Sequence, residues 1–260
     1  MKRIILIIIL LSAAKISASG FDNMMLWRFD LPAYNSKSFS FEPLSMSKQG
    51  INAILLHADP YRISSLYWNY AAFKYGMGKW GFYGSARFYG LKDLYSNDRV
   101  ELGALYRPNS NIAFALSTNH ELEQYSGYEQ YIRIDFDAKI SGSVGNFIGM
   151  IDVDKINVEK PYDFPGVATP EPMIYGAYRS NGYYQLSVGA KRLNTKRTRW
   201  FFDQDINIID NVGVRLGFYN NPNVFNWGLD LNWRLFTFEF TYFAVSKLND
   251  TMALGLSFAM

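Results

Sequence analysis

The C-terminal part of the chain alternates between apolar and polar side chains with almost no interruption. Between residues 224 and 234 one set of alternate positions holds Phe225, Trp227, Leu229, Leu231 and Trp233. The runs 236–245 and 251–259 repeat the pattern. Because successive side chains of a strand point to opposite faces, each run predicts a strand with one apolar and one polar face. Each run is about ten residues long, the length that a tilted strand needs to cross a hydrocarbon core.

The same alternation extends over most of the chain. It predicts strands at 50–58, 64–75, 79–92, 98–107, 111–122, 128–140, 146–156, 172–180, 183–192, 198–208, 211–220, 224–234, 236–245 and 251–259. Short turns rich in Gly, Asn and Asp alternate with longer connections, and outer-membrane barrels have short periplasmic turns and longer external loops. We therefore predict an all-β fold, a transmembrane up-and-down antiparallel barrel of about 14 strands over residues 50–260.

The N-terminal 49 residues fall outside this pattern. Lys2 and Arg3 precede the apolar run 4–11, which small residues follow, and this order predicts a secretory signal peptide over residues 1–19. Residues 20–49 contain one short alternating run that ends at Pro43, and they are interpreted as an N-terminal arm or a plug rather than a central strand. The absence of cysteine excludes a disulfide framework, and the net charge of +3 gives no reason to expect nucleic acid as a partner.

A soluble β-sandwich also alternates, but with its apolar face inward. Charged residues in mid-strand on the polar face and aromatic residues, Trp68 among them, on the apolar face favour the membrane barrel. The polar face would line the lumen with Arg133, Asp135, Asp137, Asp203, Asp205, Arg215, Asp230, Arg234 and Glu239. The apolar face would contact outer-membrane lipid through Trp200, Phe225, Trp227, Trp233, Phe236, Phe238, Phe240 and Tyr242.

The closing segment carries a family resemblance. The aromatic hairpin, Leu248-Asn249-Asp250-Thr251 and then Leu254-Gly255-Leu256-Ser257-Phe258 together resemble the C-terminus of outer-membrane barrels, in particular the FadL-like superfamily and its PorV/PorQ branch. The resemblance implies that Leu254, Leu256 and Phe258 form a signal for the barrel-assembly machinery, and that a type IX secretion component is a possible partner. The chain departs from the family where Asp59-Pro60-Tyr61 stands in place of an Asn-Pro-Ala motif, so a hydrophobic-substrate channel is not carried over.

The chemistry of the polar face points to a network rather than a reaction centre. Acidic and basic residues on it are nearly balanced, which predicts cross-strand ion pairs and modest ion selectivity. A polar network that fills the lumen is favoured over a substrate path. Asp135 with Asp137, or Asp203 with Asp205, could hold a hard cation, but carboxylates so spaced more often pair with bases. We expect no metal and no cofactor.

Catalysis by a membrane lipase is the alternative from another class. His120 would need a nearby nucleophile, but Ser117 lies three residues before it and points to the opposite face of an extended strand. His57 has no better partner, and no Gly-x-Ser-x-Gly motif occurs. Both histidines are interpreted as polar residues at the membrane–water interface, and the protein is predicted not to be an enzyme.

The most favoured function is therefore an outer-membrane channel or transporter for small or hydrophobic molecules in a Gram-negative type of cell. The alternative is a non-catalytic scaffold linked to protein secretion, with the proline-containing and aromatic loop 157–172 as its binding surface. Whether the lumen is open or plugged stays undecided at this point.

Overall fold

The computed structural model describes residues 43–45, 49–60, 63, 65–128, 130–156, 170–180, 184–192, 198–220, 223–245 and 250–260. The expected signal peptide, residues 20–42 of the expected arm and most of the long loop (157–169) lie outside these ranges. In the described ranges, no helix is long and apolar enough to cross a membrane.

Within the described residues, a short 3-10 helix precedes 14 strands. The elements are η1 (Pro43–Ser45), β1 (Gln49–Asp59), β2 (Leu66–Met77), β3 (Trp80–Leu91), β4 (Tyr95–Tyr106), β5 (Ile112–Tyr125), β6 (Tyr131–Val144), β7 (Phe147–Ile156), β8 (Glu171–Ser180), β9 (Tyr184–Arg192), β10 (Thr198–Ile209), β11 (Val212–Tyr219), β12 (Val224–Trp233), β13 (Phe236–Val245) and β14 (Thr251–Ala259). The predicted 14-stranded barrel is confirmed, and the largest shift of a strand boundary is at the end of β6.

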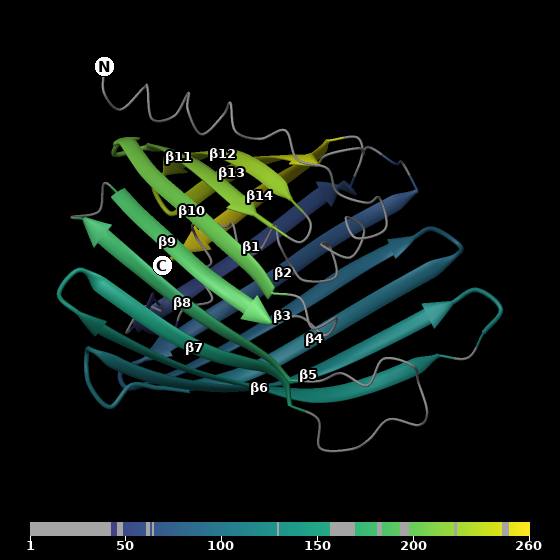
Figure 1. Cartoon of the computed structure of the whole chain (residues 1–260), viewed down its shortest axis with the longest axis horizontal. Helices are drawn as coiled ribbons and strands as arrows, with labels where there is room; N and C mark the ends of the chain where they lie inside the picture. The colour runs from purple at the N-terminus through teal and green to yellow at the C-terminus, as the bar shows by residue number, and fades with distance from the viewer. Residues whose placement is uncertain are drawn as a thin grey trace.

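The strands form one closed antiparallel sheet. Each strand pairs with its neighbours in sequence, and β1 pairs with β14 in a register that places Leu55 opposite Leu256. Figure 1 shows this closure, with the dark blue β1 beside the yellow β14. The backbones of Ile51 and Met260 exchange hydrogen bonds of 2.8 and 2.9 Å at the seam. Closure leaves no unpaired strand edge, which is the requirement for a sheet in hydrocarbon.

The two ends of the barrel differ in their connections. At one end, called the terminus end because β1 begins and β14 ends there, tight turns join the strands at 78–79, 145–146, 210–211 and 234–235. Gly78 and Gly145 have φ values of 63° and 56°, which a tight hairpin requires and glycine adopts without steric cost. At the opposite end, called the loop end, the connections are mostly longer. This asymmetry is typical of outer-membrane barrels.

The distribution of burial is the reverse of a soluble sandwich. On β12, Asn226 and Asp230 are buried on the inward face, whereas Trp227 and Trp233 on the outward face are 41% and 62% exposed. Aromatic side chains also gather near the strand ends on the outside: Trp80 packs on Tyr106 with ring centroids 4.7 Å apart. Polar inside and apolar outside, with aromatic residues near the rims, is the arrangement of a barrel with lipid around it.

Candidate functional site: two walls of the lumen

The inward face of β4–β9 forms what we call the charged wall. Its charged side chains are Arg99, Glu101, Glu121, Arg133, Asp135, Asp137, Lys139, Asp152, Asp154, Lys155, Glu171 and Lys191. Near the loop end, Glu121 pairs with Arg133 and lies 3.8 Å from Nη2 of Arg87 on β3. Nδ2 of Asn97 donates a 2.5 Å hydrogen bond to the same carboxylate. One acid is thus held by groups from three other strands.

A second group of contacts lies deeper in the charged wall. Arg99 Nη2 lies 3.1 Å from Oδ2 of Asp137, and Asn119 Nδ2 donates to the same oxygen at 2.7 Å. Toward the terminus end, Lys139 Nζ lies 3.6 Å from Oδ2 of Asp152. Each pair joins residues of different strands, so the network ties neighbouring strands together on the inside.

A β-bulge in β7 adds a further base to this wall. The register shifts between Phe136 and Ala138 of β6, where β7 contains one extra residue. Lys155 takes up the irregularity with a φ of 61°, a left-handed value that is uncommon for a residue with a side chain. As a result Asp154 and Lys155, although adjacent in sequence, are both buried inside the barrel.

The bulge joins β6, β7, β8 and β9. The backbone N–H of Lys155 donates to Oδ1 of Asp137 at 2.9 Å, and its Nζ donates to Oε1 of Glu171 at 3.0 Å. Lys191 lies 3.5 Å from the other oxygen of Glu171 and also pairs with Asp154. Two bases and three acids therefore share one buried network.

A smaller charged group lies in the terminus-end half of β11–β13. Arg215 Nη2 lies 2.8 Å from Asp230 and 3.3 Å from Glu239, and it donates to Oγ1 of Thr241 at 3.3 Å. The guanidinium lies beside Gly228, where an added Cβ would be 2.9 Å from the backbone oxygen of Phe240 and 3.3 Å from two guanidinium nitrogens. Glycine is needed at this strand position because a side chain would clash with the Phe240 carbonyl and crowd the arginine.

The remaining inner surface, which we call the apolar wall, is of opposite character. Its buried residues are Ile54, Leu56, Ala58, Leu66, Trp68, Tyr70, Ala72, Tyr89, Tyr219, Val224, Phe243 and Ala253. They lie mainly on β1 and β2 and on the loop-end halves of neighbouring strands. Trp68 and Tyr70 stack with centroids 5.8 Å apart and planes at 13°. These buried side chains pack on one another as one apolar cluster on the inner side of the barrel.

The placement of Trp68 corrects an expectation. We expected this side chain on the lipid face, but it is fully buried inside. The first two strands have apolar residues on both faces, as in Ile54-Leu55-Leu56. Polarity alone therefore does not reveal which face of these strands points into the barrel. Lys74, six residues further along β2, is also buried inside, and its charge was the signal that could have oriented the strand.

The helix η1 lies against the inner face near the terminus end. It contacts β5 and β6, and Leu44 packs on a small buried cluster that includes Leu105 and Ala113, beside Tyr83. Pro43 is buried as well. Of the expected N-terminal arm, Pro43 and Leu44 thus lie on the inside of the barrel, whereas Gln49 is the first residue of β1.

The residues predicted to line the lumen point inward with one exception. On the inward face, Asp135, Asp137, Arg215, Asp230 and Glu239 are buried, and Arg133, Asp203 and Asp205 are partly buried. Arg234 lies instead in the β12–β13 turn, exposed, with its guanidinium carbon 5.6 Å from the Trp233 ring centroid. Its φ of 56° is a turn conformation, so the strand ends one residue earlier than expected.

Several inward charged residues were absent from our predicted set. Lys155 was missed because strict alternation would place its side chain in lipid. A charged side chain in hydrocarbon is energetically costly, so its position was itself a sign of a bulge. Glu121 and Glu171 stand close to predicted strand ends, where the direction of a side chain is hardest to assign. Arg99 was missed although it follows the same parity as Glu101.

The predicted lipid-facing aromatic residues lie on the outward face. These are Trp200, Phe225, Trp227, Trp233, Phe236, Phe238, Phe240 and Tyr242. Trp227 packs between Phe240 and Tyr242 of β13, with centroids 5.4 and 5.9 Å away. The residues of the expected assembly signal, Leu254, Leu256 and Phe258, point outward from β14. Their recognition by an assembly machinery stays a prediction.

The histidines and acidic pairs have structural partners. Ser117 points inward and donates to Glu101 at 2.8 Å, whereas His120 is exposed on the outside, so the two do not meet. Asp135 accepts from Nε of Arg133 at 3.1 Å, and Asp203 accepts from the Tyr219 hydroxyl at 3.0 Å. In the described part of the chain, no group of three or more His, Cys, Asp or Glu side chains is placed to hold a metal ion.

Comparisons with known proteins agree on the fold. No family model matches the chain. No curated protein matches it. Among solved structures, the Ralstonia pickettii toluene transporter TbuX is similar with a TM-score of 0.58 and 9% identity, over 84% of this chain and 91% of that one. The Acinetobacter baumannii outer membrane protein Omp33 is similar with a TM-score of 0.54 and 9% identity, over 82% and 98%. This chain therefore has the fold of outer-membrane β-barrels.

Proposed function

We propose that this protein is an outer-membrane channel or transporter for small molecules that combine a hydrophobic part with a polar or charged group. The observation that carries the proposal is the division of the lumen: the apolar wall around Trp68 and Leu56 lies inside the same barrel as the charged wall around Glu121 and Lys155. A lumen that was only filled by a polar network would not need buried tryptophan and leucine on the inner face of the barrel.

The path would begin at the loop end. There the Tyr89 and Tyr95 rings, 6.1 Å apart, stand where the apolar wall meets the first charged residues. An apolar ring could take the place of side chains packed on the apolar wall while its polar group stays hydrogen-bonded to the charged wall, so neither part would be left without a partner. The similarity to TbuX, a toluene transporter, and to Omp33 supports the outer-membrane location and a transport role.

Swelling of protein-containing vesicles tests the proposal. The purified barrel in phosphatidylcholine vesicles should admit benzoate, which has a ring and a charge, faster than arabinose, which is polar throughout. Protein-free vesicles give the background for each solute. Migration of unboiled against boiled samples shows in the same preparation whether the barrel is closed, because a closed sheet resists detergent until heated.

The possible outcomes separate the two functional classes. Faster entry of benzoate supports the proposal. Entry of arabinose at the same rate would indicate an unselective pore, and the apolar wall would have no transport role. A heat-shifted barrel, meaning one whose gel migration changes on boiling, that admits neither solute would overturn the transport proposal and favour the secretion-linked scaffold. Co-purification with a secreted or secretion-system protein would then test the scaffold.

We further propose that Leu254, Leu256 and Phe258 are read by the barrel-assembly machinery, since they form an outward apolar ladder on the last strand. Replacing Phe258 by Ala should lower the amount of heat-shifted barrel in cells, while the purified variant should refold in detergent like the wild type. An equal defect in both settings would assign Phe258 to stability instead. The predicted lack of enzymatic activity is part of the same proposal.

A further inference from the structure

The outer face of β1–β4 is hollowed in its middle. Three alanines lie near each other on adjacent strands: Ala53, Ala71 and Ala86. Around them stand larger apolar residues, and the hollow measures about 520 Å³. Where larger outward side chains surround a group of alanines, the small side chains leave a depression between them.

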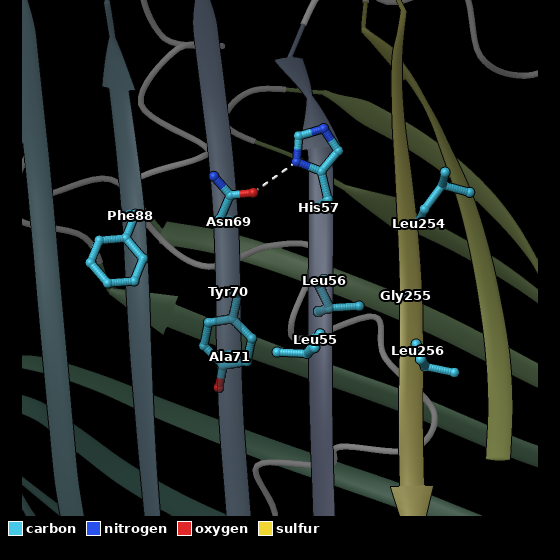
Figure 2. A pocket seen from close by; sticks show the side chains of 10 residues that line it. All are labelled: Leu55, Leu56, His57, Asn69, Tyr70, Ala71, Phe88, Leu254, Gly255 and Leu256. Atoms are coloured by element: carbon cyan, nitrogen blue, oxygen red, sulfur yellow. Dashed lines mark hydrogen bonds between the residues drawn. The ribbon is translucent and has the colours of Figure 1, made fainter.

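A second hollow continues the first toward the loop end. It measures about 410 Å³ and shares Leu55, Ala71 and Leu256 with the first, so the two form one groove, here called the outer groove. Figure 2 shows this part, with Leu254 and Leu256 of β14 on one side and Phe88 of β3 on the other. Hollows of several hundred Å³ are of the size that proteins use for small ligands.

The loop end of the outer groove is polar. His57 Nδ1 and Asn69 Oδ1 are 2.8 Å apart across β1 and β2, as the dashed line in Figure 2 marks. His57 Nε2 lies 3.3 Å from Oδ1 of Asp59, the last residue of β1. These groups are exposed on the lipid side of the wall. Four residues of strand separate Ala53 from His57, about 14 Å at ~3.4 Å per residue. The groove thus changes from apolar to polar along its length.

We propose that the outer groove binds a phospholipid of the surrounding membrane, with one acyl chain over Ala53 and Ala71 and the head group at His57, Asn69 and Asp59. The proposal rests on the proposed outer-membrane location. An acyl chain fills a narrow apolar depression, whereas its head stays at the polar interface near the strand ends. Because the Asp59 carboxylate repels bare phosphate, a head with an ammonium or hydroxyl donor fits best.

A second copy of the barrel fits the groove less well. Two convex walls would touch first at the protruding side chains, such as Phe73 and Leu102, and leave the floor at Ala71 and Ala86 unfilled. A flexible chain has no such constraint. The outward face of β12 and β13, where Trp227 and Phe238 stand above the surface, provides a reference face on the same protein.

Photo-crosslinking tests the proposal on the full-length barrel in vesicles. The probe is phosphatidylethanolamine with a diazirine near the end of one acyl chain, diluted in phosphatidylcholine, and the labelled peptides are identified by mass spectrometry. We expect the peptides of β1 and β2 to be labelled severalfold more than those of β12 and β13. Replacing His57 and Asn69 together by Ala should lower the preference for the ethanolamine probe over a choline probe.

A pair of matched substitutions completes the test. Ala71→Phe fills the groove and should reduce labelling of β1 and β2 to the level of the reference face. Ala190→Phe on β9, an outward alanine outside the groove, should leave it unchanged. Ala53→Leu serves as a second groove-filling variant if Ala71→Phe yields no heat-shifted barrel.

Two outcomes would overturn the lipid assignment. Equal labelling of all outward faces would mean that only ordinary surrounding lipid is present. Crosslinks between barrels through β1 and β2 that Ala71→Phe abolishes would identify the groove as an interface between copies. Either result in a heat-shifted barrel leaves the proposed function intact, whereas absence of the heat shift would overturn the membrane location itself.

Discussion

The two walls of the lumen use the same kind of strand but depend on their partners differently. Most charged residues of the charged wall pair with residues of opposite charge, as Glu171 does with Lys155 and Lys191. In the apolar wall, Trp68 and its neighbours need only apolar contact, which has no fixed direction. Loss of one charge therefore leaves another without compensation, whereas loss of one apolar group leaves a space.

The two walls therefore also contribute differently to the stability of the barrel and to what it can bind. Buried ion pairs gain little over well-packed apolar residues, because taking two charges out of water offsets their attraction. The charged wall is thus a weak source of stability but a strong determinant of which strand lies beside which. The apolar wall can contribute stability through burial and can accept a guest molecule. The following predictions test this contrast, beginning with the largest expected effect.

Arg215→Met should be the most damaging change, because it removes the guanidinium that pairs with both buried carboxylates, Asp230 and Glu239. Breaking a buried pair on one side typically costs about 3–5 kcal/mol. Urea unfolding of the barrel in vesicles, followed by tryptophan fluorescence, measures the loss. The triple variant that adds Asp230→Asn and Glu239→Gln should recover most of it. A loss below about 1 kcal/mol for Arg215→Met would mean that the group is not a closed network.

Trp68→Ala should cost about 3 kcal/mol, near the lower end for buried Trp to Ala, if neighbouring side chains partly fill the space that the fully buried indole leaves. The same variant should reduce the advantage of benzoate over arabinose in vesicle swelling. Trp68→Phe is the matched control, since it keeps an aromatic ring next to Tyr70 and should preserve both properties. An unchanged solute preference in Trp68→Ala would remove the apolar wall from the transport path.

Gly189→Ala tests the border between the walls. A Cβ at this position would clash with the far end of the Phe201 ring, whose Cζ and Cε atoms lie over the glycine. Overpacking of this kind costs about 1–3 kcal/mol. The additional variant Phe201→Leu should restore much of the loss in the same unfolding experiment. If Gly189→Ala alone is neutral, the ring moves freely and the wall is not packed here.

Arg133→Gln should have the smallest effect on stability, since its side chain is 26% exposed and stands near the loop end. It removes one positive charge beside Glu121 and Asp135, so the reversal potential in a salt gradient should shift toward cations. Arg192→Gln, an exposed position on the outward parity of β9, is the control and should leave the reversal potential unchanged. A shift toward anions would contradict the assignment of the charged wall to the ion path.

The sequence alone sufficed for the strands but not for every side chain within them. Where a charge and an aromatic residue alternate, as in β12, the lipid face and the lumen face could be read directly, because a charge in hydrocarbon is costly. In β1 and β2 both faces are apolar, and Trp68 was assigned to the wrong face. At Lys155 the alternation itself fails, since a bulge inserts one residue and turns the side chain inward.

The candidate site could be predicted only in part for the same reason. The inward positions of Asp137, Asp230 and Glu239 follow from parity, but their partners come from other strands. Asp137 meets Arg99 of β4 and the bulge of β7, contacts that no spacing along one strand encodes. Likewise, the outer groove depends on small residues from β1, β2 and β3 standing side by side.

The sequence by itself determined the class of fold, the number of strands and the polarity of most faces, because these follow from a period of two and from the cost of charge in lipid. Only the tertiary structure decided which charges pair, which part of the inner surface is apolar, and where the outer surface is hollow. Those features depend on the register between strands and on how the barrel closes, and register is a relation between segments rather than a property of any one of them.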